Sequence, residues 1–214
     1  MQRFITIAIC LLTVNTTFAQ SADELAAVVR DTLAAPYGGR MLQFADHIDE
    51  ESRKAYLARY GPAAREFVRK IGELPDAEKV AAFVAGYQDQ VMKVTDVKVK
   101  GDQAQAKMAF DYERLADWIM AVQVNNEYVR LAALSVKNDQ PAPKLKPIAD
   151  AFFGERHPYR AFAEARAKTM REAKITPAPS TIHMVRQSGA WKLDWRAYDR
   201  DMNVISQKLK NVSQ

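Results

Sequence analysis

Several residue types are scarce in this sequence. Cys10 is the only cysteine among 214 residues, so the chain can form no disulfide within itself. Glycine and proline are also few, with 8 and 9 residues, which excludes collagen-like and low-complexity chains. Hydrophobic residues make up 48% of the sequence, which excludes an intrinsically disordered chain and provides ample material for a core. The composition is that of an ordinary globular protein.

Signatures of common catalytic and metal sites are missing as well. Neither Gly-x-Ser-x-Gly nor Ser-x-x-Lys occurs, so serine-hydrolase and lactamase-like chemistry lack their local motifs. Gly38-Gly39 stands without the other residues of a phosphate-binding loop, and we expect it to form a turn. The histidines, His47, His157 and His183, lack the His-x-x-x-His and His-Glu-x-x-His spacings, so we expect no metal site and no cofactor. Acidic neighbours suggest that His47 lies on a solvated helix face.

The N-terminal segment has the pattern of a secretory signal peptide. A basic start at Arg3 is followed by an apolar run from Phe4 to Val14, and Thr17-Phe18-Ala19 offers small residues at a cleavage site. The run is shorter than the roughly 20 residues of a membrane span, so we expect cleavage after residue 19 and no stable membrane insertion. Cleavage would remove Cys10 and leave a mature chain without a thiol. We therefore expect a periplasmic or secreted protein.

Charged residues of both signs are interleaved along the rest of the chain. The formal net charge is +5, and loss of Arg3 with the signal peptide lowers it to +4. A charge of this size favours solubility and weak attraction to anionic surfaces, and it identifies no partner. Because we expect export, nucleic acid is not an expected partner. An unknown small molecule or a periplasmic protein is expected instead.

Apolar spacing predicts that the front of the mature chain is helical. The first helix begins at Asp23 and ends before Pro36-Tyr37-Gly38-Gly39. A second helix follows, and Gly61-Pro62 is expected to break the chain before a third. Asp76 is a candidate N-cap for a fourth helix, whose apolar face includes Val80 and Val84.

The spacing of apolar residues changes to a strand pattern near Val91. Val97 and Val99 alternate with lysines, and apolar residues alternate with polar ones from residue 103 to Phe110. The Gly101-Asp102 pair between these runs is typical of a turn. This pattern predicts a β-hairpin with one face turned to a core and one to solvent.

Residues 114–179 are predicted to be mainly helical. Helical spacing runs from Leu115 to Leu134, and another helix is expected from about Pro158 to Ala173. Residues 138–147 contain three prolines and are expected to form an extended loop between these helices.

The end of the chain predicts a second hairpin and a closing helix. Strands are expected at residues 181–186 and 190–196, joined by Gln187-Ser188-Gly189. Alternation would place Trp191, Leu193 and Trp195 on one strand face. The closing helix is expected from about Tyr198 to Leu209.

The run Val-Arg-Gln-Ser-Gly-Ala-Trp-Lys-Leu-Asp-Trp from Val185 to Trp195 resembles the final hairpin of the nuclear-transport-factor-two-like (cystatin-like) superfamily. Late strands in that superfamily often carry a polar-Gly-x-Trp-Lys-apolar-Asp run. The resemblance implies an α+β fold in which N-terminal helices pack on a curved antiparallel sheet. We expect a single α+β domain over residues 20–214. It would have a helical insertion at about 114–179 and a C-terminal β-hairpin plus helix.

The resemblance also implies where an active site would lie. In that superfamily the concave side of the sheet lines a pocket in which an Asp, His or Tyr can act as a general base. On this basis His183 with Asp111 or Tyr112 is the best acid-base set that the chain offers. Alternation places His183 on the strand face opposite Ile182 and Met184.

Tryptophans supply the candidate ligand-binding side chains. Trp191 and Trp195 belong to the predicted C-terminal hairpin. Trp118 lies in an apolar middle helix that would either cover the core or close over a pocket as a lid.

Three functions remain open from the sequence. The absence of catalytic motifs favours an exported, non-catalytic binding or interaction protein of unknown ligand. The first alternative is an enzyme of the isomerase or dehydratase type, which requires His183 and a carboxylate to meet in a closed apolar pocket. The second alternative is a periplasmic inhibitor or immunity-type protein that binds a partner protein.

Overall fold

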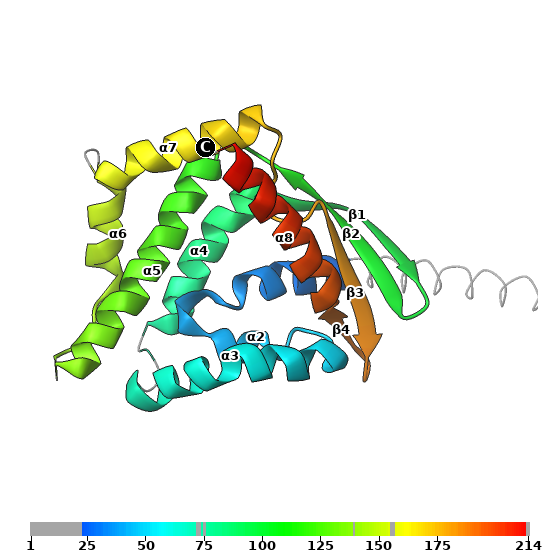
Figure 1. The fold of residues 1–214 in the computed structure, drawn as a ribbon, viewed down its shortest axis with the longest axis horizontal. Helices are drawn as coiled ribbons and strands as arrows, with labels where there is room; N and C mark the ends of the chain where they lie inside the picture. The colour runs from blue at the N-terminus through cyan, green and yellow to red at the C-terminus, as the bar shows by residue number, and fades with distance from the viewer. Residues whose placement is uncertain (1–22, 72–73, 75, 139, 155–156, 213–214) are drawn as a thin grey trace, which may run out of the picture.

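The computed structural model describes residues 23–71, 74, 76–138, 140–154 and 157–212 (Figure 1). The expected signal peptide at residues 1–19 lies outside these ranges. The described elements, in chain order, are a helix at 23–34, η1 (Tyr37–Gly39), α2 (Met41–Phe44), α3 (Glu50–Ile71), α4 (Ala77–Val91), β1 (Met92–Lys100), β2 (Gln103–Phe110), α5 (Leu115–Lys137), α6 (Leu145–Phe153), α7 (Pro158–Glu172), β3 (Thr181–Gln187), β4 (Ala190–Leu193) and α8 (Trp195–Asn211). Helices come first, and a helical middle separates two hairpins.

One antiparallel sheet joins the two hairpins in the order β1-β2-β3-β4. The first hairpin turns at Gly101 and the second at Gly189, both of which have a positive φ that glycine adopts without strain. Strands β2 and β3 pair with each other although the helical middle separates them in the sequence. In this pairing Ala106 lies opposite Ile182. Both predicted hairpins are confirmed, and they are neighbours in the sheet.

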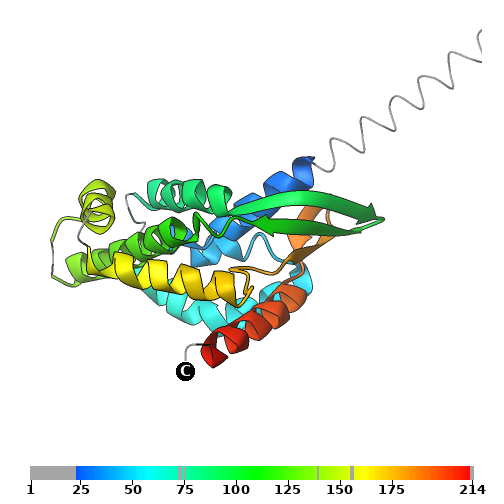
Figure 2. The same cartoon turned by 90° about the horizontal axis from the view of Figure 1, so that it is seen from above.

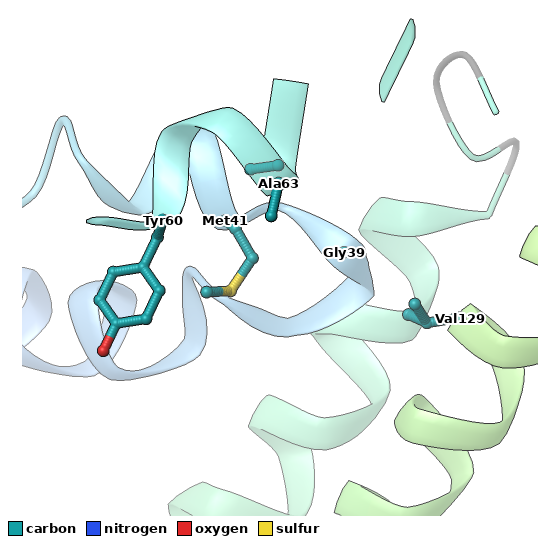
Figure 3. Close-up of a pocket in the computed structure, with 6 residues that line it drawn as sticks. Gly39, Met41, Tyr60, Ala63 and Val129 are labelled. Carbon is teal, nitrogen blue, oxygen red and sulfur yellow. The ribbon is translucent and has the colours of Figure 1, made fainter. Parts of the chain in front are cut away.

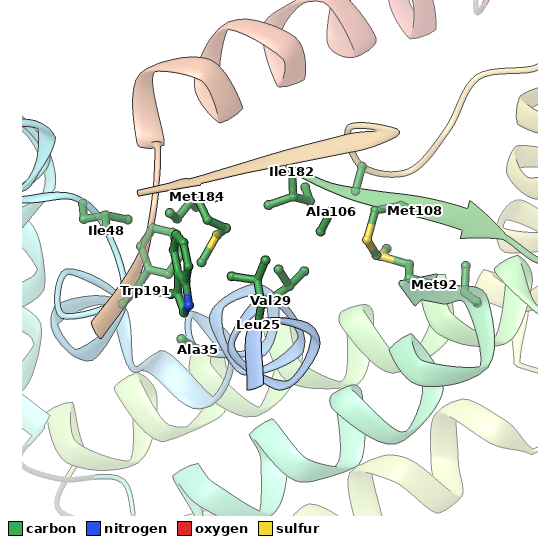
Figure 4. Close-up of a cluster of buried hydrophobic side chains, with 14 of the residues drawn as sticks. Leu25, Val29, Ala35, Ile48, Met92, Ala106, Met108, Ile182, Met184 and Trp191 are labelled. Atoms are coloured by element: carbon green, nitrogen blue, oxygen red, sulfur yellow. The ribbon is translucent and has the colours of Figure 1, made fainter. Parts of the chain in front are cut away.

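The main core lies between the sheet and the first helix. Leu25 and Val29 are fully buried on the helix at 23–34, and Figure 4 shows them facing Ile182, Met184 and Ala106 of the sheet. Full burial of a Leu or Val side chain contributes about 1.5–3 kcal/mol to stability. The structure therefore confirms the predicted α+β class, with an N-terminal helix on one face of the sheet.

The helical middle forms a second core cluster with α4. Val80 of α4 and Val124 and Tyr128 of α5 are fully buried there, and the Tyr128 hydroxyl accepts a hydrogen bond from the Asp76 backbone N–H at 3.2 Å. The N-terminal end of α5 reaches the main core through Leu115. In Figure 2 the helical middle lies at the end of the molecule away from the β1–β2 turn. Helix α5 thus joins the two clusters.

Residues 47–49 join the N-terminal third of the chain to the last strand by backbone hydrogen bonds. The Leu193 N–H donates to the His47 carbonyl at 2.8 Å, and the Asp49 N–H donates to the Leu193 carbonyl at 2.9 Å. Ile48 forms an isolated parallel bridge with Leu193. This short pairing covers the outer edge of β4.

The Asp49 carboxylate caps two helices at once. Its Oδ1 accepts a hydrogen bond from the Ser52 N–H at 2.9 Å, and its Oδ2 accepts one from the Trp195 N–H at 3.1 Å. These donors lie at the N-termini of α3 and α8, where the helix dipoles favour a negative charge. Asp49 is only 8% exposed, and within the described chain no basic side chain forms an ion pair with it. One buried carboxylate therefore fixes the start of both helices.

Two prolines lie in helices, where the sequence patterns predicted a chain break at Pro62 and a loop at Pro147. Gly61-Pro62 was expected to break the chain, but α3 continues through Pro62 to Ile71. Proline removes the bond to the carbonyl of Ala58, and because both residues are exposed, water can satisfy that carbonyl. Pro147, expected in a loop, lies in the first turn of α6, where its missing N–H has no helical partner in any case.

The last strand ends earlier than predicted. Strand β4 stops at Leu193, and Trp195 is the first residue of α8, so it does not share a strand face with Trp191. The cause is Asp194, whose carboxylate accepts a hydrogen bond from the Ala197 N–H at 3.0 Å and caps the helix. The closing helix therefore begins three residues before its expected start.

Candidate functional site

An apolar pocket lies between α3, α5 and the η1–α2 segment, with a volume of about 240 Å³. Its described lining residues are Gly39, Met41, Tyr60, Ala63, Ala64 and Val129. Figure 3 shows Tyr60 and Ala63 from α3 on one side of Met41 and Gly39, with Val129 of α5 on the other. None of these lining residues carries a charge. The pocket is therefore suited to an apolar group.

A row of aromatic rings leads away from the pocket. Tyr60 contacts Tyr56 at 5.0 Å between ring centroids, Tyr56 contacts Trp195 at 5.4 Å, and Trp195 stacks on Tyr198 at 5.7 Å. Phe44 lies edge-on to both Tyr56 and Trp195 at 5.3 Å. We call these five residues the aromatic wall. It connects α3, which lines the pocket, to the first turns of α8.

Gly38 and Asn125 hold η1 against α5. The Gly38 N–H donates to the Asn125 Oδ1 at 2.7 Å, and both residues are buried. Gly38 has a φ of +71°, and a Cβ at this position would lie 2.2 Å from the Ala77 carbonyl oxygen. Only glycine fits so close to the α4 backbone. This anchor positions the adjacent Tyr37 beside α5.

The Tyr37 hydroxyl of η1 is within electrostatic range of two other aromatic side chains, Trp118 of α5 and Tyr198 of α8. We call these three residues the polar aromatic cluster. The Trp118 Nε1 is buried and has no partner of normal hydrogen-bond geometry within the described chain. The indole is nevertheless close enough to the Tyr37 hydroxyl to lower its pKa, while burial and the nearby Tyr198 raise it more strongly. Of the polar atoms in this cluster, the Trp118 Nε1 is therefore the one that is both buried and without a partner among the described residues.

Burial keeps the phenols of this cluster protonated. It raises the pKa of Tyr198 to about 12, and it raises the pKa of Tyr37 well above its ordinary value of 10.0. A phenol in such surroundings remains neutral at physiological pH. Tyr37 and Tyr198 are therefore hydrogen-bonding groups and are poorly suited to act as bases.

None of the candidate tryptophans Trp118, Trp191 and Trp195 is among the described residues that line the pocket. Trp118 belongs to the polar aromatic cluster, and Trp195 belongs to the adjoining aromatic wall, stacked on Tyr198. Trp191 lies elsewhere, 5% exposed in the main core, with the Arg186 guanidinium 5.8 Å from its ring centroid. Trp118 also lies 11 residues before Val129 on α5, which is about 16 Å along the helix.

The acid-base candidates are not brought together. His183 lies opposite Gln105 in the β2–β3 register, whereas Asp111 and Tyr112 follow the end of β2. Six residues of strand separate Gln105 from Asp111, a distance of about 20 Å. No hydrogen bond or ion pair joins the side chains of the three candidates, all of which the structure describes. The exposed Asp111 carboxylate instead accepts a hydrogen bond from the Glu113 N–H.

Most of the pocket was not identified from the sequence. Met41, Ala63, Ala64 and Val129 come from three separate elements and have no local motif. One signal was present, because Tyr56 and Tyr60 are spaced at i, i+4 and so lie on one face of a helix. Their neighbours Phe44 and Trp195 could not be paired with them without the tertiary structure.

The prediction that His47 lies on a solvated helix face is wrong, because His47 lies in a bend between α2 and α3. His47 is half-buried, and its Nδ1 lies 3.4 Å from the Thr32 hydroxyl. Burial lowers the pKa of His47 below 6.5, and Lys192 and Arg40 act in the same direction. Asp31 and Asp46 oppose this shift only in part. His47 is therefore favoured in its neutral form in the folded protein.

Stability should decrease as the pH falls through the ordinary titration range of histidine. Because the folded pKa of His47 lies below that of the unfolded chain, its contribution is complete above about pH 6.5 and is lost at lower pH. Urea unfolding at pH 8, 7, 6 and 5 should show a shallower decline in H47Q than in the parent protein. Parallel curves for the two proteins would contradict this assignment.

No group of three or more His, Cys, Asp or Glu side chains in the described ranges is placed to hold a metal ion. Across the same ranges, no helix combines the length and apolarity needed to cross a bilayer.

Comparison of the chain with protein-family models, curated proteins and solved structures gave no match. The resemblance of the last hairpin to the nuclear-transport-factor-two-like superfamily therefore stays a prediction. The structure defines an α+β fold with one four-stranded antiparallel sheet. An apolar pocket lies among its helices.

Proposed function

We propose that this chain is an exported, non-catalytic binding protein whose pocket holds a small apolar molecule. The observation that carries the proposal is the pocket itself, because every described residue that lines it is uncharged and the aromatic wall continues from its rim. Apolar surface that a ligand buries there contributes about 25 cal/mol per Å². An ionic group in the same place would lose its hydration and gain no charged partner.

The structure offers less support for the other two functions. An isomerase or dehydratase would need His183 beside a carboxylate, and the register separates it from Asp111. Burial raises the pKa of the Tyr37 and Tyr198 phenols, which makes these two side chains poorly suited to act as bases. No described surface points specifically to an inhibitor or immunity role. Export rests on the pattern of residues 1–19 and stays a prediction.

Filling the pocket should weaken the binding of an apolar probe. Ala64 is half-buried and lines the pocket, so A64F places a ring in the space available to a ligand. Titration of the purified protein with the neutral fluorophore N-phenyl-1-naphthylamine should show saturable binding with one site per chain. We expect A64F to weaken this binding at least tenfold, which corresponds to about 1.4 kcal/mol.

The matched control lies on the same helix. Ala58 is exposed on α3 and does not line the pocket, so A58F adds the same ring elsewhere and should bind within twofold of the parent protein. Thermal melting of both variants checks that they remain folded. Absence of saturable binding to the parent protein, or equal binding by A64F, would overturn the proposed function.

A further inference from the structure

We infer that the groove between the start of α4 and α6 is a second binding site, which takes an amphiphilic molecule with one negative charge, such as a carboxylate or sulfonate on an apolar body. We call it the lysine-rimmed groove. Its volume is about 650 Å³, which lies in the usual range of small-molecule sites. It shares no described lining residue with the apolar pocket. The inference therefore stands apart from the proposed function.

The apolar part of the groove lining comes from both helices. It consists of Phe83 of α4 and of Leu145 and Ala149 of α6, all of which are partly exposed. Leu145 and Ala149 are spaced at i, i+4 and so lie on one face of α6. The Phe83 ring is edge-on to Tyr87 and Phe153, at centroid distances of 5.3 and 6.0 Å, and these contacts hold it in place. The groove thus offers a fixed apolar surface that a ring or an alkyl chain can cover.

The charged part of the lining has one more positive group than negative groups. Lys79 pairs with Asp76 at 2.7 Å, and Lys146 pairs with Asp150 at 2.6 Å. Lys144 also lines the groove, is exposed, and forms no ion pair within the described chain. A ligand with one negative charge would balance these five groups, whereas a second charge would have no counter-charge left.

Neither part of the lining is sufficient alone. An exposed ion pair with a lysine is weak, so an anion without an apolar body would be held poorly. A neutral apolar molecule could cover Phe83 and Leu145, but it would leave the charge of Lys144 unused. A molecule that combines both features gains from both parts of the groove at once. This requirement separates the groove from the apolar pocket, whose described lining residues are all uncharged.

Two fluorophores that share one ring system test this inference. The anion 8-anilino-1-naphthalenesulfonate has the skeleton of N-phenyl-1-naphthylamine with one added sulfonate. Titration of A64F, in which a ring fills the apolar pocket, measures the groove by itself. We expect A64F to bind the sulfonate at one site per chain and roughly fivefold more tightly than the neutral probe, as a favourable exposed ion pair provides. Raising the sodium chloride concentration from about 0.05 M to about 0.5 M should reduce this preference by screening the charges.

Substitutions in the A64F background locate the bound sulfonate. K144E should weaken its binding about fivefold or more and leave the affinity for the neutral probe unchanged. The matched control is K98E, because Lys98 is exposed on β1, forms no ion pair within the described chain and lies outside the groove lining. It changes the net charge equally and should keep the sulfonate preference. A149F fills part of the groove with a ring and should also weaken sulfonate binding.

The outcomes separate the two sites. Absence of saturable sulfonate binding to A64F would overturn the inference, and so would equal losses in K144E and K98E or sulfonate binding that A149F leaves unchanged. Thermal melting of each variant checks that it remains folded. The proposed function depends instead on the neutral probe in the parent protein, so its failure there would leave the result for the groove intact.

Discussion

Replacing Gly38 by alanine is expected to destabilise the protein by about 3 kcal/mol or more. The new Cβ would lie 2.2 Å from the Ala77 carbonyl oxygen, and the backbone at this residue has a φ of +71°, which alanine adopts only with strain. The α4 backbone cannot move away easily, because Val80 and Val84 on that helix are fully buried. Relief of the clash would displace η1 and weaken the Gly38–Asn125 hydrogen bond.

Urea unfolding monitored by circular dichroism measures this loss directly. Gly86 provides the matched control, because it is exposed in α4 and a Cβ there has nothing within 4 Å. Alanine in a helix interior is favoured over glycine by about 1 kcal/mol, so G86A should be neutral or slightly stabilising. A G38A protein within 1 kcal/mol of the parent would contradict the close approach of η1 to α4. Its probe binding should also be weakened, because Gly39 and Met41 line the pocket.

Replacing Asp49 by alanine is expected to cost about 2–4 kcal/mol, because it removes the caps of two helices at one position. The Ser52 and Trp195 N–H groups would each lose a charged acceptor. Water cannot fully replace this acceptor, since the site is buried. D49N should lie between the parent and D49A, because its single amide oxygen can accept only at one of the two positions.

Two other aspartates give a graded comparison. Asp194 caps only α8, through the Ala197 N–H, and D194A should cost about 1 kcal/mol. Asp46 is exposed and pairs with Arg53 on the surface, so D46A should change the stability by less than about 0.5 kcal/mol. Thermal and urea unfolding should therefore rank the losses as D49A, D194A and D46A. A D49A loss no larger than that of D194A would show that the carboxylate does not support both helices.

Local patterns were sufficient to predict most of the secondary structure. Alternation around Gly101 and Gly189 predicted both hairpins, and turn residues correctly placed the end of the first helix. The errors arose where a tertiary or capping interaction overrides a local signal. Pro62 does not end α3 because the carbonyl that it leaves free faces solvent, and Asp194 ends β4 because it caps the next helix.

The candidate site could be predicted only in part, for a physical reason. A pocket formed by η1, α2, α3 and α5 depends on helix packing, and single residues such as Ala64 and Val129 carry no sign of it in the sequence. The tryptophans were selected because large aromatic side chains are conspicuous in any chain, but none of Trp118, Trp191 and Trp195 is among the described residues that line the pocket. Alternation correctly placed His183 on the face opposite Ile182, but the distance to Asp111 depends on the β2–β3 register. That register is set by the packing of the whole sheet.

The backbone pairing between residues 47–49 and Leu193 constrains the order in which this protein folds. Asp49 caps its second helix, α8, through the Trp195 N–H, which lies 146 residues further along the chain. Helices α3 and α4, and the Asp49 cap of α3, can form from local contacts, but the pairing along the edge of β4 and the Asp49 cap of α8 must wait until β4 and α8 are available. Because α3 and α8 both carry parts of the aromatic wall, we expect this wall to be completed late in folding. Before that step, its unpacked rings form an apolar surface through which immature chains can associate with each other.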